Sequence, residues 1–100
     1  MAGTLGASLS PAKQLGTLAK YEKRLRAAIA RPDSDAKMTS AIARVRQAQL
    51  SVLKARRDLI RQRTATTALI KQLKRIEADE TKWLALSDNE IVGRYNFSRT

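Results

Sequence analysis

The segment from Asp35 to Glu80 contains neither Gly nor Pro, the two residues that most often interrupt a helix. Apolar residues recur through it at alternating spacings of three and four, which is typical of a helix packed along one seam against another helix. One set of seam positions holds Met38, Val45, Val52, Leu59, Thr66 and Leu73, and the other holds Ala41, Ala48, Ala55, Gln62, Leu69 and Ile76. The pattern predicts one long helix over residues 34–80.

The seam becomes polar in residues 62–67, where Gln62 and Thr66 occupy seam positions. Three of these six residues are Thr, and β-branched side chains lose rotamer freedom inside a helix. Two interpretations are open: a polar layer within a continuous helix, or a break in the helix at this point. We favour the continuous helix.

A shorter helix is predicted over residues 11–30. Ser10 is a favourable N-cap residue, and Pro11 at the first helical position sacrifices no hydrogen bond. Pro32 ends this helix because the residue before a proline is driven out of the α region. The chain is therefore expected to be all-α: a helical hairpin, or antiparallel coiled coil, over residues 11–86, with one long basic helix. Residues 1–10 are expected to form a flexible tail.

The two predicted helices differ in length. A helix over residues 11–30 spans about 30 Å, whereas a continuous helix over residues 34–80 would span about 70 Å. The far half of the long helix therefore needs another cover: the C-terminal segment, a second copy of the chain or another protein. We favour a homodimer. The predicted helix-packing interface consists of Met38, Val45, Val52, Leu59, Leu69, Leu73, Ile76 and Trp83.

The positive charge is concentrated in one part of the chain. Residues 37–75 hold eleven Lys or Arg and one acid, Asp58, so they carry +10 of the formal net charge of +11. Like-charged pairs four residues apart, such as Arg57 with Arg61, destabilise a helix. Because this arrangement does not serve the stability of the helix, it indicates that the cations bind a negatively charged partner. Each phosphate that Lys or Arg neutralises releases counterions, and the planar Arg fork suits phosphate.

These cations predict a nucleic-acid-binding protein that contacts the phosphate backbone within a nucleoprotein assembly or regulatory complex. The pattern does not distinguish DNA from RNA. The expected contacts come from Arg44, Arg46, Lys54, Arg56, Arg57, Arg61, Arg63, Lys71, Lys74 and Arg75. The alternative is a structural adaptor, or assembly coiled-coil protein, whose cations dock onto acidic protein surfaces.

The chain contains no Cys and no His. Disulfides, Cys nucleophiles and His acid–base chemistry are therefore excluded, and a zinc site would have to be built from carboxylates alone. We expect no catalysis, no cofactor and no metal site. No signal peptide or bilayer-spanning apolar run is recognisable, so a cytoplasmic location, or one inside a nucleoprotein particle, is expected, without a membrane partner.

Residues 87–100, SDNEIVGRYNFSRT, predict a short C-terminal helix, because Ser87 and Glu90 have capping-box spacing. This segment also resembles the first helix and turn of a helix-turn-helix DNA-binding motif. The resemblance rests on Glu90 before Ile91 and Val92, then Tyr95, Asn96 at the turn, Phe97, and Ser98-Arg99 opening the recognition helix. It implies contact with the DNA major groove by a further helix, which the printed sequence does not include.

The alternative for this segment is a hook that folds back over the far end of the long helix. Apolar residues suited to that packing are Trp83, Leu84, Leu86, Ile91, Tyr95 and Phe97. We favour the hook.

Overall fold

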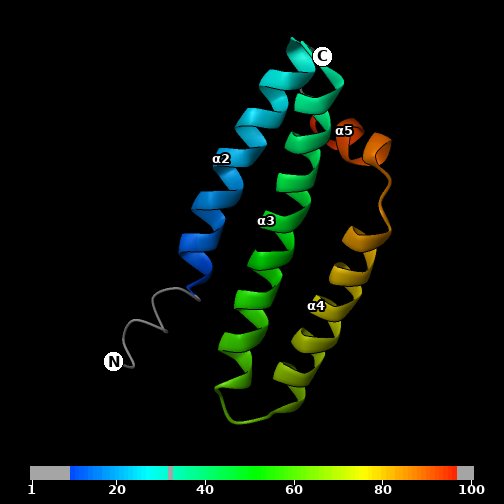
Figure 1. Ribbon diagram of the computed structural model, residues 1–100. Coiled ribbons are helices and arrows are strands. Elements are labelled where there is room, and N and C mark those ends of the chain that lie inside the picture. Colours follow the sequence, from blue (N-terminus) through cyan, green and yellow to red (C-terminus); the bar gives the residue numbers. More distant parts are fainter. Residues whose placement is uncertain (1–9, 32, 97–100) are drawn as a thin grey trace.

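The computed structural model describes residues 10–31 and 33–96 of the chain (Figure 1). Four helices make up this part, and it contains no strand. They are α2 (Pro11–Ala30), α3 (Asp35–Arg61), α4 (Thr67–Ala85) and α5 (Asp88–Asn96). The all-α class is therefore confirmed. Apart from Ser10, the predicted flexible tail lies outside the described residues.

Helix α3 stands in the middle of the bundle. Helices α2 and α4 pack against it from two sides and run antiparallel to it, and α5 lies at the end where α2 and α3 are joined (Figure 1). Within the described residues, α2 and α4 make no extensive contact with each other. Helix α3 is consequently the one element that α2, α4 and α5 all share.

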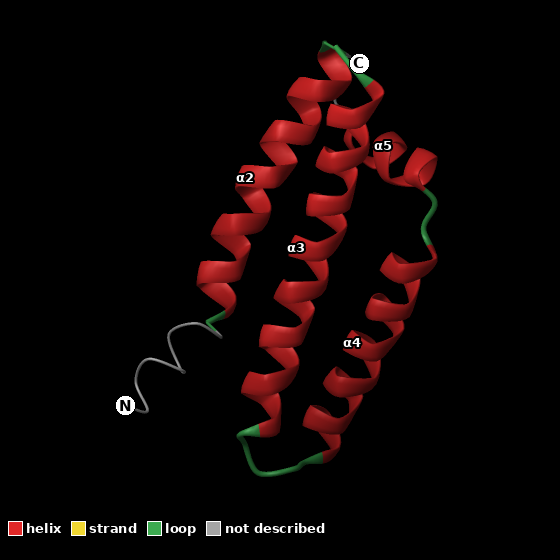
Figure 2. Cartoon of the chain, in the orientation of Figure 1, coloured by secondary structure: helices red, strands yellow, loops and turns green. Residues whose placement is uncertain are grey.

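The predicted continuous helix over residues 34–80 is wrong, because the chain reverses at residues 62–66 (Figure 2). The last turn of α3 tightens there: the Gln62 N–H donates to the Leu59 carbonyl at 3.3 Å. Thr66 then caps α4, since its side-chain oxygen accepts a hydrogen bond from the Leu69 N–H at 3.2 Å. The break that we considered at residues 62–67 is the arrangement found, and a Thr that is unfavourable inside a helix is well suited to a cap. Helix α4 also continues to Ala85, five residues past the predicted end at residue 80.

The starts of α2 and α3 differ in how they are capped. Ser34 caps α3 by accepting a hydrogen bond from the Lys37 N–H at 3.1 Å. Ser10 occupies the N-cap position of α2, but its side chain makes no capping hydrogen bond. Pro11 at the start of α2 is therefore the signal that marks this boundary correctly.

Folding α4 back onto α3 covers the residues for which the length argument required a partner. Ile76 and Trp83 of α4 are buried in the common core, and Leu69 and Leu73 pack partly buried against it. A single chain thus supplies its own cover for the far half of the predicted long helix. The homodimer stays a prediction, but the difference in helix length no longer supports it.

The core is formed by more than one side of α3. Val45, Ala48 and Val52 are buried seam residues, as predicted. Met38, another predicted interface residue, packs partly buried against the same core. Ile42, Leu53 and Ile60 are also buried, although they lie outside the predicted seam. They are buried because three helices, α2, α4 and α5, pack on different sides of α3.

Leu59 departs from the predicted packing interface, because it is 41% exposed. It follows Val45 and Val52 at seven-residue spacing and so lies on their side of α3, which faces α2. Gln14 of α2 lies beside Ser51 of α3, because both line one hollow between these helices. The first residue of α2, Pro11, is only three residues before Gln14. Since the two helices are antiparallel, Pro11 does not reach the level of Leu59.

Helix α5 begins at the predicted capping box. The Ser87 N–H donates to Glu90 Oε1 at 2.9 Å, and the Glu90 N–H donates to Ser87 Oγ at 3.2 Å. These hydrogen bonds, led by that from the Ser87 backbone, lower the pKa of the Glu90 carboxyl. The predicted short C-terminal helix is therefore present, with both halves of its cap formed.

The position of α5 corrects the predicted hook. The segment folds back, but it packs against α2 and α3 at their joined end, where Ile91 and Tyr95 are buried. Leu84, assigned to the hook, is 65% exposed. Asn96, the predicted turn residue of the helix-turn-helix resemblance, still belongs to α5, while Phe97, Ser98 and Arg99 lie outside the described residues. The resemblance stays a prediction.

Tyr95 links α5 to α2, because its hydroxyl donates a hydrogen bond to Glu22 Oε2 at 2.6 Å. The Arg26 guanidinium lies 5.2 Å from the centre of the Tyr95 ring. Burial, together with the hydrogen bond to Glu22, raises the pKa of Tyr95 well above its usual value near 10. The folded chain therefore retains the neutral phenol at a pH where the unfolded chain loses its proton.

This difference predicts that the free energy of unfolding falls as the pH rises above about 10, because only the unfolded state then gains stability by ionising Tyr95. Below about pH 10 the contribution is fully present. Tyr95→Phe should remove this part of the decline, and Tyr21→Phe, which deletes the hydroxyl of the chain's other tyrosine, should retain it. Urea unfolding monitored by circular dichroism between about pH 8 and about pH 11 measures the effect. Identical declines in the two variants would contradict the assignment.

Candidate nucleic-acid interface

Arg46, one of the predicted phosphate contacts, is used inside the bundle. Its Nη1 donates to the carbonyl oxygens of Trp83 and Leu86, each at 2.7 Å, and its Nη2 donates to Asp88 Oδ1 at 3.1 Å. The side chain is 19% exposed. Because it satisfies carbonyls at the end of α4 that lack helical partners, it ties α3 to the α4–α5 connection. Arg46 is therefore a structural residue.

Arg57 is likewise committed to packing. Its Nη1 forms an ion pair with Glu80 Oε1, which joins α3 to α4. Both side chains are mostly buried, and the Arg57 Nε has no hydrogen-bond partner among the described residues. A guanidinium held in this way is not free to approach a phosphate.

The remaining predicted cations do not share one surface. Arg44 lines a groove between α2 and α3, whereas Arg56, Arg63 and Arg75 line another between α3 and α4. Four others are exposed and line neither groove: Lys54, Arg61, Lys71 and Lys74. The structure thus divides the predicted basic segment into distinct sites.

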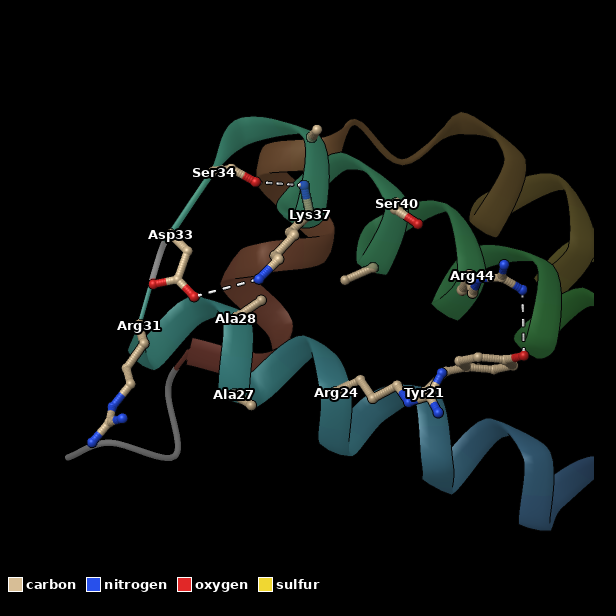
Figure 3. Close-up of a pocket in the computed structure, with 12 residues that line it drawn as sticks. Tyr21, Arg24, Ala27, Ala28, Arg31, Asp33, Ser34, Lys37, Ser40 and Arg44 are labelled. Carbon is tan, nitrogen blue, oxygen red and sulfur yellow. Dashed lines mark hydrogen bonds and ion pairs between the residues drawn. The ribbon is translucent and has the colours of Figure 1, made fainter.

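The α2–α3 groove encloses about 590 Å³ beside the joined ends of these helices (Figure 3). Its wall includes Ala27, Ala28, Ala36 and Ala41, and such short side chains leave a hollow where larger ones would fill it. A second hollow of about 390 Å³ continues it toward Gln14 and shares Tyr21, Ser40 and Arg44 with it. We treat the two hollows together as the α2–α3 groove.

Four cations from both helices surround this groove. Arg24 and Arg31 come from the α2 side, and Lys37 and Arg44 come from α3. All four are exposed, so their charged groups are accessible to a ligand. Asp33 is the one acid among the lining residues. The groove therefore carries a strong positive excess.

Tyr21 lies at the centre of this cluster. The guanidinium carbons of Arg24 and Arg44 are 5.6 and 5.5 Å from the centre of its ring, and Arg44 Nη1 donates to the Tyr21 hydroxyl at 3.4 Å (Figure 3). Lys20 Nζ is 6.0 Å from the same centre. These distances are within the range of cation–π attraction, which holds cationic side chains beside an aromatic ring. Tyr21 thus gathers charge contributed by two helices.

The groove cations are poorly neutralised by the protein itself. Lys37 pairs with Asp33 at 3.7 Å, but their side chains are 74% and 69% exposed, and such a pair is weak. Ion pairs in the part of the chain that the structure describes involve only Lys37, Arg46 and Arg57 among the cations. Arg24, Arg31 and Arg44 have therefore no carboxylate partner in residues 10–31 and 33–96.

The sequence prediction included Arg44 of this groove and missed Tyr21, Arg24, Arg31 and Lys37. The set was drawn mainly from the most basic part of residues 37–75, whereas residues 1–36 carry a modest excess of cations. A signal was available in the spacing of Tyr21, Arg24 and Arg31. Steps of three and seven residues place all three on one side of a helix.

The α3–α4 groove differs in character. It encloses about 320 Å³, and its lining residues are Leu53, Arg56, Leu59, Ile60, Arg63, Gln72, Arg75, Ile76 and Asp79. Large apolar side chains form much of this wall, with three guanidinium groups and one carboxylate among them. It combines an apolar surface with positive charge.

Comparisons of the chain with protein-family models, with curated proteins and with solved structures find no match. Among residues 10–31 and 33–96, no helix is both long and apolar enough to cross a membrane. The described residues also contain no cluster of three His, Cys, Asp or Glu side chains placed to hold a metal ion. The geometry of the two grooves is therefore the basis for a functional proposal.

Proposed function

We propose that this chain is a non-catalytic nucleic-acid-binding protein that contacts phosphates mainly through the α2–α3 groove. The observation that supports this most is the gathering of Arg24, Arg31, Lys37 and Arg44 around Tyr21, with Asp33 as the sole lining acid. The protein would act within a nucleoprotein assembly or a regulatory complex.

The groove offers the two kinds of contact that sequence-tolerant binding uses. Guanidinium groups neutralise phosphates and donate paired hydrogen bonds to them. Tyr21 and the planes of the neighbouring Arg24 and Arg44 offer flat surfaces on which unpaired bases stack. Because every base has a stacking face and every nucleotide a phosphate, these contacts would serve DNA or RNA without a preferred sequence.

The exposed cations outside the groove would extend its field. Lys54, Arg61, Lys71 and Lys74 lie on α3 and α4 and raise the local concentration of a polyanion without forming the main contacts. We also propose that α2 and α3 act as a helical hairpin whose coiled-coil-like seam, through Val45 and Val52, fixes the register of the groove. The expected cellular setting is the cytoplasm or a nucleoprotein particle.

This function predicts binding to random-sequence DNA and RNA that weakens steeply with salt. Four phosphate contacts give a slope of about −3 to −4 in a plot of log K against log salt, so affinity should fall about 100-fold between about 50 and about 200 mM. Fluorescence anisotropy of labelled oligonucleotides measures the slope. Absence of binding near about 50 mM salt would overturn the proposal and favour the adaptor function.

A further inference from the structure

The α3–α4 groove contains a feature that a phosphate chain would not use. Leu59 lies in its wall and is 41% exposed, although it is a large aliphatic side chain. Leu53, Ile60 and Ile76 line the same groove and are buried below it. The phosphates of a nucleic acid offer no apolar group to cover Leu59, whereas an apolar protein side chain does.

The groove also includes a part of α3 that α2 does not cover. Leu59 continues the side of α3 that packs against α2 through Val45 and Val52, but the first residue of α2, Pro11, lies short of this level. A helix placed beyond the start of α2 would cover Leu59 in the way that α2 covers Val52. Among the described residues, no helix covers Leu59 at this level.

Charge indicates which kind of helix fits. Arg56, Arg63 and Arg75 line the groove, and Asp79 is its one acid. A second copy of this chain carries a formal net charge of +11 and would be repelled, whereas a helix bearing carboxylates would be attracted. The complementary partner has apolar residues on one face and acids beside them.

We propose that the α3–α4 groove docks an acidic amphipathic helix of a partner protein. Its apolar residues, recurring at steps of three and four, would cover Leu59, while its carboxylates would pair with Arg56, Arg63 and Arg75. The stretch of α3 from Leu53 to its end at Arg61 is about 12 Å long, which corresponds to about two turns of the bound helix. With nucleic acid in the α2–α3 groove, the protein would bridge a polyanion and a protein.

The probe for this proposal is a labelled synthetic peptide with Leu at helical spacing on one face and Glu on the others. A scrambled peptide of identical composition is its control, since it carries the same charge without an apolar face. The amphipathic peptide should bind, and Leu59→Glu should weaken its binding about tenfold or more by placing a carboxylate in the groove. Arg63→Glu should act in the same direction. Leu84→Glu, which changes an exposed Leu outside the groove, should bind the peptide like the unmodified protein.

Circular dichroism would confirm that each variant folds, and binding of random-sequence nucleic acid would be measured alongside. Nucleic-acid binding that survives in Leu59→Glu supports two independent surfaces, so failure of the docking proposal is separable from failure of the proposed function. Equal binding of the scrambled peptide, or no effect of Leu59→Glu, would overturn the proposal. Displacement of the peptide by nucleic acid would reassign the groove to phosphate. A dimer dissociated by Leu59→Glu would show that a second copy is the occupant.

Discussion

Arg46→Ala is expected to lower the free energy of unfolding by about 2–4 kcal/mol, a large part of the stability of a small domain. The wild-type guanidinium donates hydrogen bonds to two carbonyl oxygens and to Asp88, and Ala supplies none of them. The carbonyls of Trp83 and Leu86 would lose a charged donor at the point where α4 gives way to α5. Water can reach this point only partly, because the Arg46 side chain is itself 19% exposed.

Urea unfolding followed by circular dichroism measures this loss. Arg56→Ala is the matched control, because it removes the same side chain from an exposed position on α3 and should change stability by less than about 0.5 kcal/mol. Arg46→Lys should lie between the two, since one ammonium cannot reproduce the fork that reaches three acceptors. Equal stability of Arg46→Ala and Arg56→Ala would contradict the structural role.

Local sequence signals predicted several of the helix ends. Pro11 marked the start of α2, Pro32 marked its end, and Ser87 with Glu90 marked the start of α5. Each of these signals acts through hydrogen bonds or torsion angles within a few residues of itself. Such boundaries can therefore be read without knowing the rest of the fold.

The break between α3 and α4 could not be decided locally. Thr66 is compatible with a polar layer in a long helix and with an N-cap, and the capping hydrogen bond to Leu69 exists only once the chain has turned. What favours the turn is tertiary: α4 covers its own Ile76 and Trp83 by packing on α3. The seven-residue pattern described the packing faces and carried no information on which helix would cover them.

The sequence predicted that the chain carries a cationic surface, but not which cations would lie together on it. An excess of cations was evident, yet Arg46 and Arg57 serve the α3–α4 packing, a role that depends on Trp83 and Glu80 lying opposite them. Arg44 meets Tyr21 across 23 positions of sequence. That meeting depends on the register of α2 against α3, which charge counting along the chain does not reveal.

Replacing the four groove cations by Ala is expected to weaken nucleic-acid binding about 100- to 1000-fold near about 100 mM salt, because each lost phosphate contact removes about fivefold under those conditions. The substitutions are Arg24→Ala, Arg31→Ala, Lys37→Ala and Arg44→Ala. All four side chains are exposed, so the helical fold should remain. Anisotropy with random-sequence oligonucleotides gives the affinity, and circular dichroism checks the fold.

A second quadruple variant changes the net charge by the same amount outside the groove. Its substitutions are Lys54→Ala, Arg61→Ala, Lys71→Ala and Lys74→Ala. These cations act on the ligand mainly at a distance, and salt screens interactions between exposed charges beyond about 10 Å. We expect this variant to lose less than about tenfold in affinity. Equal losses in the two quadruple variants would mean that total charge, and not the groove, determines binding.

The most direct test of the central claim is the salt dependence of binding in the groove variant compared with the unmodified chain. If the four cations contact phosphates, the slope of log K against log salt should become less steep by about 3, whereas the matched variant outside the groove should retain most of its slope. Unchanged slope in the groove variant would show that these side chains do not neutralise phosphates and would contradict the proposed interface.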